Sequence, residues 1–190
     1  MSLDGFVAGP EQSVDNPLGI GGMKLHEWHF DPMHEADLPV RDNLLGPKGA
    51  YVMGRNMFGP IRGEWHGDWT GWWGEEPPYH APVFVLTHHE REPVELKGGT
   101  TFHFVTDGIE SALAKAREAA GERSVAVAGG ASTVNQYLAI GAIDELRLHV
   151  APLVFGKGER LFEGVGDITL VPVEATGTEL VTHLTYRVVR

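Results

Sequence analysis

Short segments that are apolar at nearly every position constrain the fold of this chain most strongly. They occupy residues 50–53, 82–87 and 125–128, with the sequences AYVM, PVFVLT and VAVA. A strand with one face in water alternates apolar and polar residues, whereas a continuous apolar run fits a parallel strand that is buried on both faces. Residues 101–105, TFHFV, predict a further strand. These segments therefore favour a mainly parallel sheet.

Helical patterns separate the predicted strands. The strongest covers residues 109–120, and its apolar face consists of Ile109, Leu113, Ala116 and Ala120. Asp107 is the expected N-cap of this helix and Gly121 its end. Further helices are expected at residues 32–45, before Gly46-Pro47, and at residues 131–140.

Strands alone follow from residue 145 onward. Residues 145–155 predict a longer strand that is broken or bulged at Pro152, and residues 169–174 and 179–189 predict a terminal antiparallel hairpin. Alternating strands and helices followed by strands indicate an α/β fold, with helices on both faces of the sheet and an antiparallel edge. The 190 residues suit one domain, 1–190. A short strand is expected at residues 2–8, followed by a loop over residues 9–30 whose length is typical of functional loops.

Composition excludes several classes of function. The formal net charge is −11, with 26 acidic and 15 basic residues, which argues against a nucleic acid partner because phosphate backbones need clustered Lys and Arg. No apolar segment approaches the ~20 residues of a membrane-spanning helix. The absence of cysteine excludes disulfides and thiolate catalysis. The first residues, MSLDGFVAGP, lack the basic region of a secretory signal, so a cytoplasmic location is expected.

Two adjacent glycines, Gly129 and Gly130, stand where a predicted strand gives way to a helix. The first turn of a helix offers free N–H groups and a positive dipole end, and glycines allow a phosphate to approach the backbone closely. Ser132 and Thr133 could donate hydroxyl hydrogen bonds to such a phosphate. A tight turn with Ser132 as N-cap explains the same residues equally well. Neither G-x-G-x-x-G nor the Walker A pattern is present.

Two other strand ends carry groups that suit a phosphate. Gly54 and Arg55 follow the strand at residues 50–53, and Thr87 and His88 end the strand at residues 82–87. Ligands of open α/β sheets bind at the carboxyl ends of the strands, and an arginine can fork onto a phosphate. A surface arginine remains an equally good reading of Arg55 alone.

The segments SLDGFVAG, VMGRNMF, VFVLT, AGGASTVNQYL and IDELRLHVAPLVFGKGERLF together resemble the dihydrofolate reductase-like superfamily. The chain is most similar to the reductase domain of riboflavin-pathway deaminase-reductases and to its stand-alone relatives. The resemblance covers nearly the whole chain in order. It implies a three-layer α/β fold, an NADPH cofactor, a small planar acceptor such as a pterin or a riboflavin precursor, and a homodimer formed through the C-terminal strands.

The resemblance also implies a set of cofactor residues. It assigns the pyrophosphate to the glycine pair and the following helix start, and phosphates near the adenosine to the glycine-arginine turn. The adenosine 2′-phosphate would meet the end of the next strand, and the nicotinamide would face the N-terminal strand. The residues concerned are Gly129, Gly130, Ala131, Ser132, Thr133 and Val134 for the pyrophosphate, Gly54, Arg55 and Asn56 for the turn, Thr87 and His88 for the 2′-phosphate, and Val7 and Ala8 for the nicotinamide.

The chain departs from the family pattern at two positions. Met57 stands where dihydrofolate reductases usually have a threonine that donates to phosphate, and Ser132 stands where riboflavin-pathway reductases tend to carry an acid. These departures leave open an alternative, a non-catalytic module that binds a nucleotide or small molecule on the same fold.

The substrate side is less well defined by the sequence. By resemblance, Asp37 is the candidate proton donor, although a solvated acidic helix face explains Asp37 and its acidic neighbours at least as well. Trp28 is expected at the mouth of a pocket, against a planar substrate. The histidines around it lack a third ligand at fixed spacing, so no metal site is expected. The segment from Trp65 to Trp73 could be a lid, a dimer contact or a packed loop.

Overall fold

The computed structural model describes residues 1–30, 34–59 and 62–189. The chain folds into two compact units, which are described separately. Unit 1 consists of Met1–Leu44 and Val134–Arg190, and unit 2 of Leu45–Thr133. Both boundaries fall within helices, α1 (Leu38–Leu45) and α4 (Ala131–Ala139). The expectation of a single domain stays a prediction.

Unit 2 contains a five-stranded sheet in the order β4-β5-β3-β2-β6. Its strands are β2 (Ala50–Gly54), β3 (Pro82–Leu86), β4 (Val94–Glu95), β5 (Thr101–Val105) and β6 (Val125–Val127). The strands β5, β3, β2 and β6 are parallel, and the edge strand β4 pairs with β5 in the antiparallel direction. The predicted mainly parallel sheet is thus confirmed.

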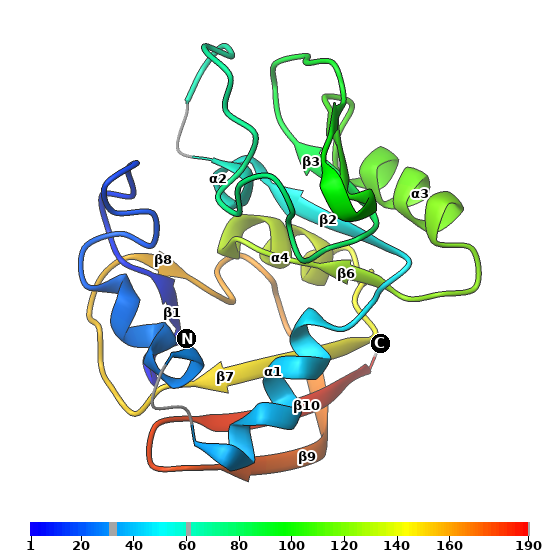
Figure 1. The fold of residues 1–190 in the computed structure, drawn as a ribbon. Helices are drawn as coiled ribbons and strands as arrows, with labels where there is room; N and C mark the ends of the chain where they lie inside the picture. Colours follow the sequence, from blue (N-terminus) through cyan, green and yellow to red (C-terminus); the bar gives the residue numbers. More distant parts are fainter. Residues whose placement is uncertain (31–33, 60–61, 190) are drawn as a thin grey trace. The chain divides into compact units, whose positions relative to one another are not determined.

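Two helices accompany this sheet in unit 2. Helix α3 (Ile109–Ala120) packs on β2, β3 and β6 (Figure 1), and its buried side consists of Ala112, Leu113, Ala116 and Ala120. The N-cap of α3 is Gly108 rather than Asp107, because the Asp107 carboxylate accepts hydrogen bonds from Ser111 and Lys115 instead. The short helix α2 (Arg55–Phe58) follows β2 directly.

A buried cluster in unit 2 combines aliphatic and aromatic side chains. Its buried residues are Tyr51, Met53, Phe58, Ala81, Val83, Val85 and Phe102. Trp65 and Trp69 pack against this cluster, and the Trp69 indole Nε1 donates a 2.8 Å hydrogen bond to the Phe58 carbonyl oxygen. From the sequence, the segment from Trp65 to Trp73 is expected to be a lid, a dimer contact or a packed loop. Trp65 and Trp69 fit the packed loop, whereas Trp73 is 57% exposed.

Unit 1 contains a three-stranded antiparallel sheet in the order β7-β10-β9. Strands β9 (Thr169–Gly177) and β10 (Thr182–Val189) form the predicted terminal hairpin, and β10 also pairs with β7 (Glu145–Val150). The strand expected over residues 145–155 ends at Val150. Pro152, which has no N–H group to donate, follows two residues later. Strand β1 (Phe6–Ala8) pairs with β8 (Glu159–Arg160).

Helices of unit 1 differ from the expected ones at two places. The expected loop over residues 9–30 contains a 3-10 helix, Gly22–His29, which buries Leu25 and Trp28. The helix expected over residues 32–45 begins only at Leu38, after a 3-10 turn at Glu35–Asp37, and residues 31–33 of that range lie outside the described part of the chain. A third 3-10 turn, Lys97–Gly99, lies in unit 2.

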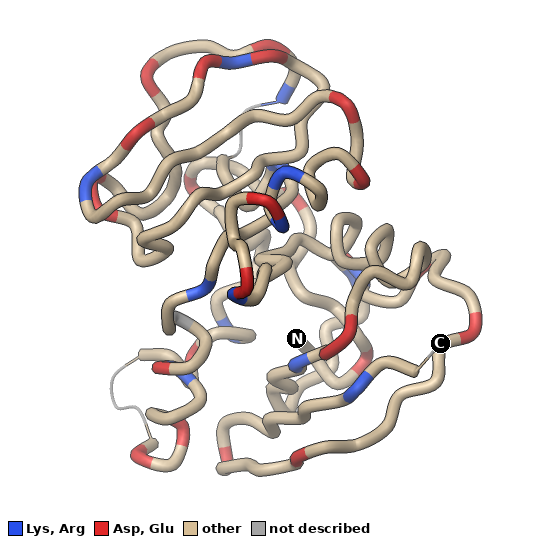
Figure 2. Tube along the Cα trace, turned by 90° about the vertical axis from the view of Figure 1, so that its right-hand side faces the viewer, with Lys and Arg blue, Asp and Glu red and all other residues tan. Residues whose placement is uncertain are grey.

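Acidic residues occur along the whole trace, with basic residues between them (Figure 2). In residues 1–30, 34–59 and 62–189, none of the helices has the length and apolar character needed to cross a bilayer.

Candidate functional site

Three strand ends meet at one edge of the sheet in unit 2. Strands β3, β2 and β6 are parallel neighbours, so the residues that follow them lie on the same side. Backbone hydrogen bonds extend this pairing beyond the strands: Ala128 N donates to Val52 O, and Gly54 N donates to Gly129 O, both at 2.8 Å. The glycine pair and the glycine-arginine turn are therefore brought together, as the sequence predicts.

The glycine pair leaves its edge of the backbone accessible. Gly129 has a φ of 105°, a conformation that favours glycine, and the Gly129–Gly130 peptide bond is cis. A Cβ built on Gly129 would lie 3.5 Å from Met57 Sδ. One built on Gly130 would meet no described heavy atom within 4 Å beyond its chain neighbours. A ligand can thus approach Gly130 without displacing a side chain.

Helix α4 begins immediately after the glycine pair. Ala131 is its first residue, and Thr133 N donates to Gly130 O at 3.1 Å. Ser132, the N-cap of the turn interpretation, lies inside the first turn and is exposed, whereas Thr133 is 5% exposed. Of the two hydroxyls, that of Ser132 is the accessible one, and Thr133 is part of the packing beside Gly54.

The Arg55 guanidinium is fixed by three contacts. Its Nη1 donates to Thr87 Oγ1 at 2.8 Å, and its Nη2 donates to the Gly63 carbonyl oxygen at 2.9 Å. The guanidinium carbon lies 3.3 Å from the centre of the Trp65 ring, which is cation–π geometry. The structure therefore brings Arg55 and Thr87 together, two residues that the sequence places 32 positions apart.

Two further arginines lie near Arg55. Burial lowers the pKa of Arg55, and the charges of Arg62 and Arg91 lower it further. Within the described ranges, none of the three forms an ion pair with a carboxylate, although Asp68 acts on Arg91 at longer range. The Arg55 Nε–H is buried and has no hydrogen-bond partner among the described residues. A buried donor without an acceptor suggests that an anion or water supplies one.

The remaining residues of this edge have defined partners. Thr87 is 8% exposed, and its Oγ1 accepts from both Arg55 and the His89 amide, so Thr87 positions the arginine. His88 is exposed. The Asn56 side-chain oxygen accepts a hydrogen bond from Arg62 Nη1, which holds this second arginine at the turn.

Asp37 lies in a buried polar network of unit 1. It has no exposed surface; its Oδ2 accepts from Thr178 Oγ1 and its Oδ1 lies within hydrogen-bond distance of His183 Nε2, both at 3.1 Å. His183 Nδ1 in turn lies 2.8 Å from His149 Nδ1. Burial, followed by the charge of His183, lowers the pKa of His149 to about 3. The expected solvated acidic face is therefore wrong for Asp37, since this carboxylate is an internal acceptor.

Trp28 belongs to the same network. It is 2% exposed, and its ring centre lies 4.8 Å from that of His183 and 5.1 Å from that of His149. The structure thus places Trp28 in the core rather than at a pocket mouth, because the 3-10 helix turns this side chain inward. Its role in substrate binding and that of Asp37 in catalysis stay predictions.

The predicted cofactor residues are divided between the units. Val7, Ala8 and Val134 belong to unit 1, and the others belong to unit 2. Ala8 is 6% exposed within β1. In the described part of the chain, no group of three or more His, Asp or Glu side chains is arranged to hold a metal ion.

Residues 1–183 match the sequence model of a protein family, the RibD C-terminal domain. The chain belongs to this family. The resemblance to the reductase domain of the riboflavin-pathway enzymes, based on five segments spread along the chain, is confirmed.

Relatives of this RibD C-terminal domain protein include the uncharacterized protein YyaP of Bacillus subtilis. The two are 27% identical over 172 residues, which is 85% of this chain and 76% of YyaP. A candidate riboflavin biosynthesis protein from Shewanella sp. PV-4 shares the fold with a TM-score of 0.69 at 21% identity, over 100% of this chain and 96% of that one. The bifunctional deaminase and 5-amino-6-(5-phosphoribosylamino)uracil reductase of Thermotoga maritima shares the fold with a TM-score of 0.59 at 16% identity. The match covers 98% of this chain and 54% of that enzyme.

Sequence reasoning on this family member missed Arg62, Arg91 and Trp65 as parts of the Arg55 environment. They lie in loops with no periodic pattern, so spacing could not show that they converge. No local signal pointed to this arrangement, since Arg55 and Arg91, whose guanidinium groups lie over the Trp65 ring, stand outside the Trp65–Trp73 segment.

Proposed function

We propose that the chain is an NADPH-dependent reductase that transfers hydride to a small planar heterocyclic or imine acceptor. The observation that carries this proposal is the Arg55 guanidinium, fixed by Thr87 and Trp65 at the strand edge that also holds the glycine pair. Membership of the RibD C-terminal domain family supports a reductase. The Thermotoga maritima enzyme is a 5-amino-6-(5-phosphoribosylamino)uracil reductase, which supports a pyrimidine-like acceptor.

The residues of unit 2 fit the phosphates of NADPH. A guanidinium has five N–H donors, and Arg55 uses two of them on Thr87 and Gly63. Arg62 and Arg91 add positive charge beside it, which suits the dianionic 2′-phosphate. Gly130 gives the pyrophosphate close access to the helix start of α4. When bound, NADPH supplies the hydride; these residues supply its binding and orientation.

The test of the cofactor assignment is the variant Gly130→Asp. A new carboxylate beside the pyrophosphate should weaken NADPH binding by roughly a hundredfold, because like charges repel strongly at close range. Gly130→Ala is the matched control; its methyl group has room, so its affinity should stay within a few fold of the original. NADPH fluorescence during titration measures both, and equal affinities for the two variants would contradict the assignment.

One observation favours a non-catalytic module as the second candidate. Asp37, the candidate acid, is fully buried and already hydrogen-bonded, so it has no surface from which to deliver a proton. Incubation with NADPH and a panel of pterins and flavin precursors separates the candidates. Acceptor-dependent loss of NADPH absorbance supports the reductase, whereas NADPH binding without oxidation supports the module.

A further inference from the structure

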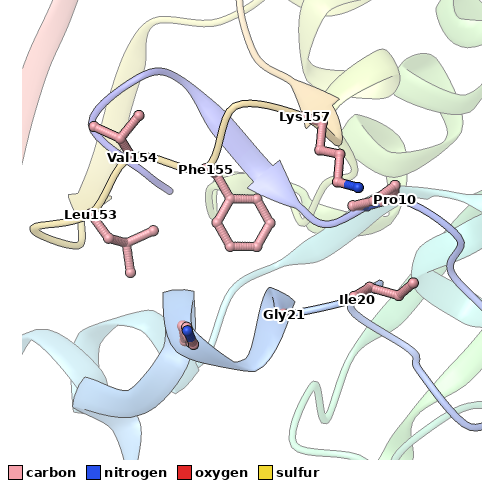
Figure 3. Close-up of a pocket in the computed structure, with 8 residues that line it drawn as sticks. Pro10, Ile20, Gly21, Leu153, Val154, Phe155 and Lys157 are labelled. Atoms are coloured by element: carbon pink, nitrogen blue, oxygen red, sulfur yellow. The ribbon is translucent and has the colours of Figure 1, made fainter.

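A pocket in unit 1 lies outside the residues assigned above. It has a volume of about 280 Å³. The N-terminal segment and the segment after β7 line it, through Pro10, Ile20, Gly21, Lys24, Leu153, Val154, Phe155 and Lys157. In Figure 3 the Phe155 ring points toward Gly21, and the Lys157 side chain extends toward Pro10. The volume is near the lower end of the range for small-molecule sites, which suits a ligand of one or two rings.

The N-terminal wall of the pocket is held in place by its own backbone. Gly9 N donates to Leu18 O, and Ile20 N donates to Pro10 O, both at 2.8 Å. A Cβ built on Gly19 would lie 2.1 Å from the Gly9 carbonyl oxygen, so only glycine permits this approach. Residues 9–20 of the predicted loop therefore form a preformed wall.

The opposite wall is fixed by Asp4. Its two carboxylate oxygens accept from the amides of Phe155 and Gly156 at 2.9 and 2.7 Å. Hydrogen bonds from the Ser2 side chain and from these amides lower the pKa of Asp4 to about 2. The carboxylate is thus engaged in holding the turn, and Asp4 is not a lining residue.

The charged groups that line the pocket are two lysines. Neither Lys24 nor Lys157 forms an ion pair with a carboxylate in the described ranges, although acidic residues outnumber basic ones 26 to 15. Asp4 adds a negative charge behind the wall formed by Phe155 and Gly156. The residues that line the pocket themselves carry two positive charges and no negative one.

The rest of the lining is apolar and partly open to solvent. Val154 is 73% exposed and Ile20 is 50% exposed, and the neighbouring Met23 and Leu3 are 53% and 72% exposed. Leu3 N donates to Leu153 O, which places Leu3 beside this wall. Several large apolar side chains exposed around one pocket favour a ligand that covers them.

We infer that this pocket binds a small aromatic molecule that carries one carboxylate or phosphate group. The ring packs on Phe155 and the apolar wall, and the anionic group pairs with Lys24 and Lys157. This site is built within unit 1 and does not depend on the reductase proposal.

Isothermal titration calorimetry with naphthoate, naphthyl phosphate and neutral naphthylmethanol tests the inference. Both anions should saturate the protein at millimolar concentration or below, and the alcohol should bind more weakly. Lys24→Ala and Lys157→Ala should each weaken anion binding about 2- to 5-fold, and the double variant about 5- to 20-fold, with no change for the alcohol. The stronger of the two anions identifies the carboxylate or phosphate preference.

Two further variants control the experiment. Lys97→Ala removes the same charge from an exposed site in unit 2 and should leave naphthoate binding unchanged. Ile20→Glu adds a carboxylate at a half-exposed lining position and should reduce naphthoate binding about tenfold. Absence of saturable anion binding, or equal losses in the Lys97 and pocket variants, overturns the inference. NADPH titration of the same variants reports on the proposed function separately.

Discussion

The Thr133 hydroxyl occupies the space that a side chain on Gly54 would need. A Cβ built on Gly54 would lie 2.5 Å from Thr133 Oγ1, although the φ of Gly54, −76°, is one that any residue adopts. Glycine is therefore required here by packing rather than by conformation. The contact joins the end of β2 to the first turn of α4.

Gly54→Ala should lower the free energy of unfolding by about 1–3 kcal/mol, because the new methyl group overpacks this contact. Thr133→Ala removes the obstructing oxygen, so the double variant should be more stable than the sum of the two single losses predicts, by about 0.5–3 kcal/mol. Urea denaturation of the four proteins measures this coupling. Strict additivity would show that the two residues do not compete for space.

Arg55→Ala should weaken NADPH binding about 10- to 100-fold and NADH binding much less, because a charge-assisted hydrogen bond to the 2′-phosphate is lost. Fluorescence titration with both coenzymes measures the ratio. Arg117→Ala, which removes the same charge from the exposed surface of α3, is the control. Equal losses for NADPH and NADH would place Arg55 on the pyrophosphate instead.

Asp37→Ala should lower the free energy of unfolding by about 2–4 kcal/mol, since it leaves Thr178 and His183 without their acceptor. Thr178→Val removes one of the two hydrogen bonds and should cost about 1 kcal/mol. Asp42→Ala, at an exposed carboxylate, should change stability by less than about 0.5 kcal/mol. Chemical denaturation compares them, and an unchanged stability of Asp37→Ala would contradict the buried network.

Acid should destabilise the protein through histidines that the fold partly buries. Burial lowers the pKa of His149 from 6.5 to about 3 and that of His26 to about 4. Between the unfolded pKa of 6.5 and the lowered folded pKa, each of these histidines binds a proton in the unfolded chain but not in the folded one. Their contribution to the free energy of unfolding is therefore complete above pH 6.5 and is lost as the pH falls toward the folded pKa. His149→Gln should make this dependence shallower, measured as unfolding free energy against pH. The exposed His66→Gln is the control, and the same slope in both variants would refute the assignment.

Homodimerisation through the C-terminal strands stays a prediction. β9 is an edge strand of its sheet, and Val173 on it is 63% exposed. Edge strands with exposed apolar residues are available for pairing, so Val173→Lys should shift the protein toward monomer. Light scattering over a range of concentrations measures the mass. A monomeric mass for the wild-type protein at all concentrations would contradict the prediction.

The sheet and the strand ends could be predicted from sequence because local patterns determine them. Continuous apolar runs identified β2 and β3, and a helical repeat identified α3 within its observed bounds. The 3-10 helix Gly22–His29 could not be predicted in this way. It follows a glycine-rich segment, and it is stabilised by burying Leu25 and Trp28, which is a tertiary effect.

Side-chain placement within the candidate site was less predictable. Four acidic residues lie between residues 31 and 42, and nothing in their spacing distinguishes Asp37, whose burial depends on Thr178 and His183 about 140 positions later. Arg55 could be identified because it directly follows a strand. Its neighbours Arg62 and Arg91 could not, because their positions depend on how two irregular loops fold back.

The arginines around Trp65 stand in a molecule whose total charge is −11. At low salt, where the Debye length reaches about 30 Å, an approaching polyanion first experiences mainly the repulsion of the net negative charge. Only at close range does the attraction by the guanidinium groups exceed this repulsion. Added salt should therefore speed the diffusional encounter of an anionic ligand with the protein, because it screens the repulsion by the net charge. It should also shorten the time for which the ligand stays bound, because it screens the attraction by the guanidinium groups.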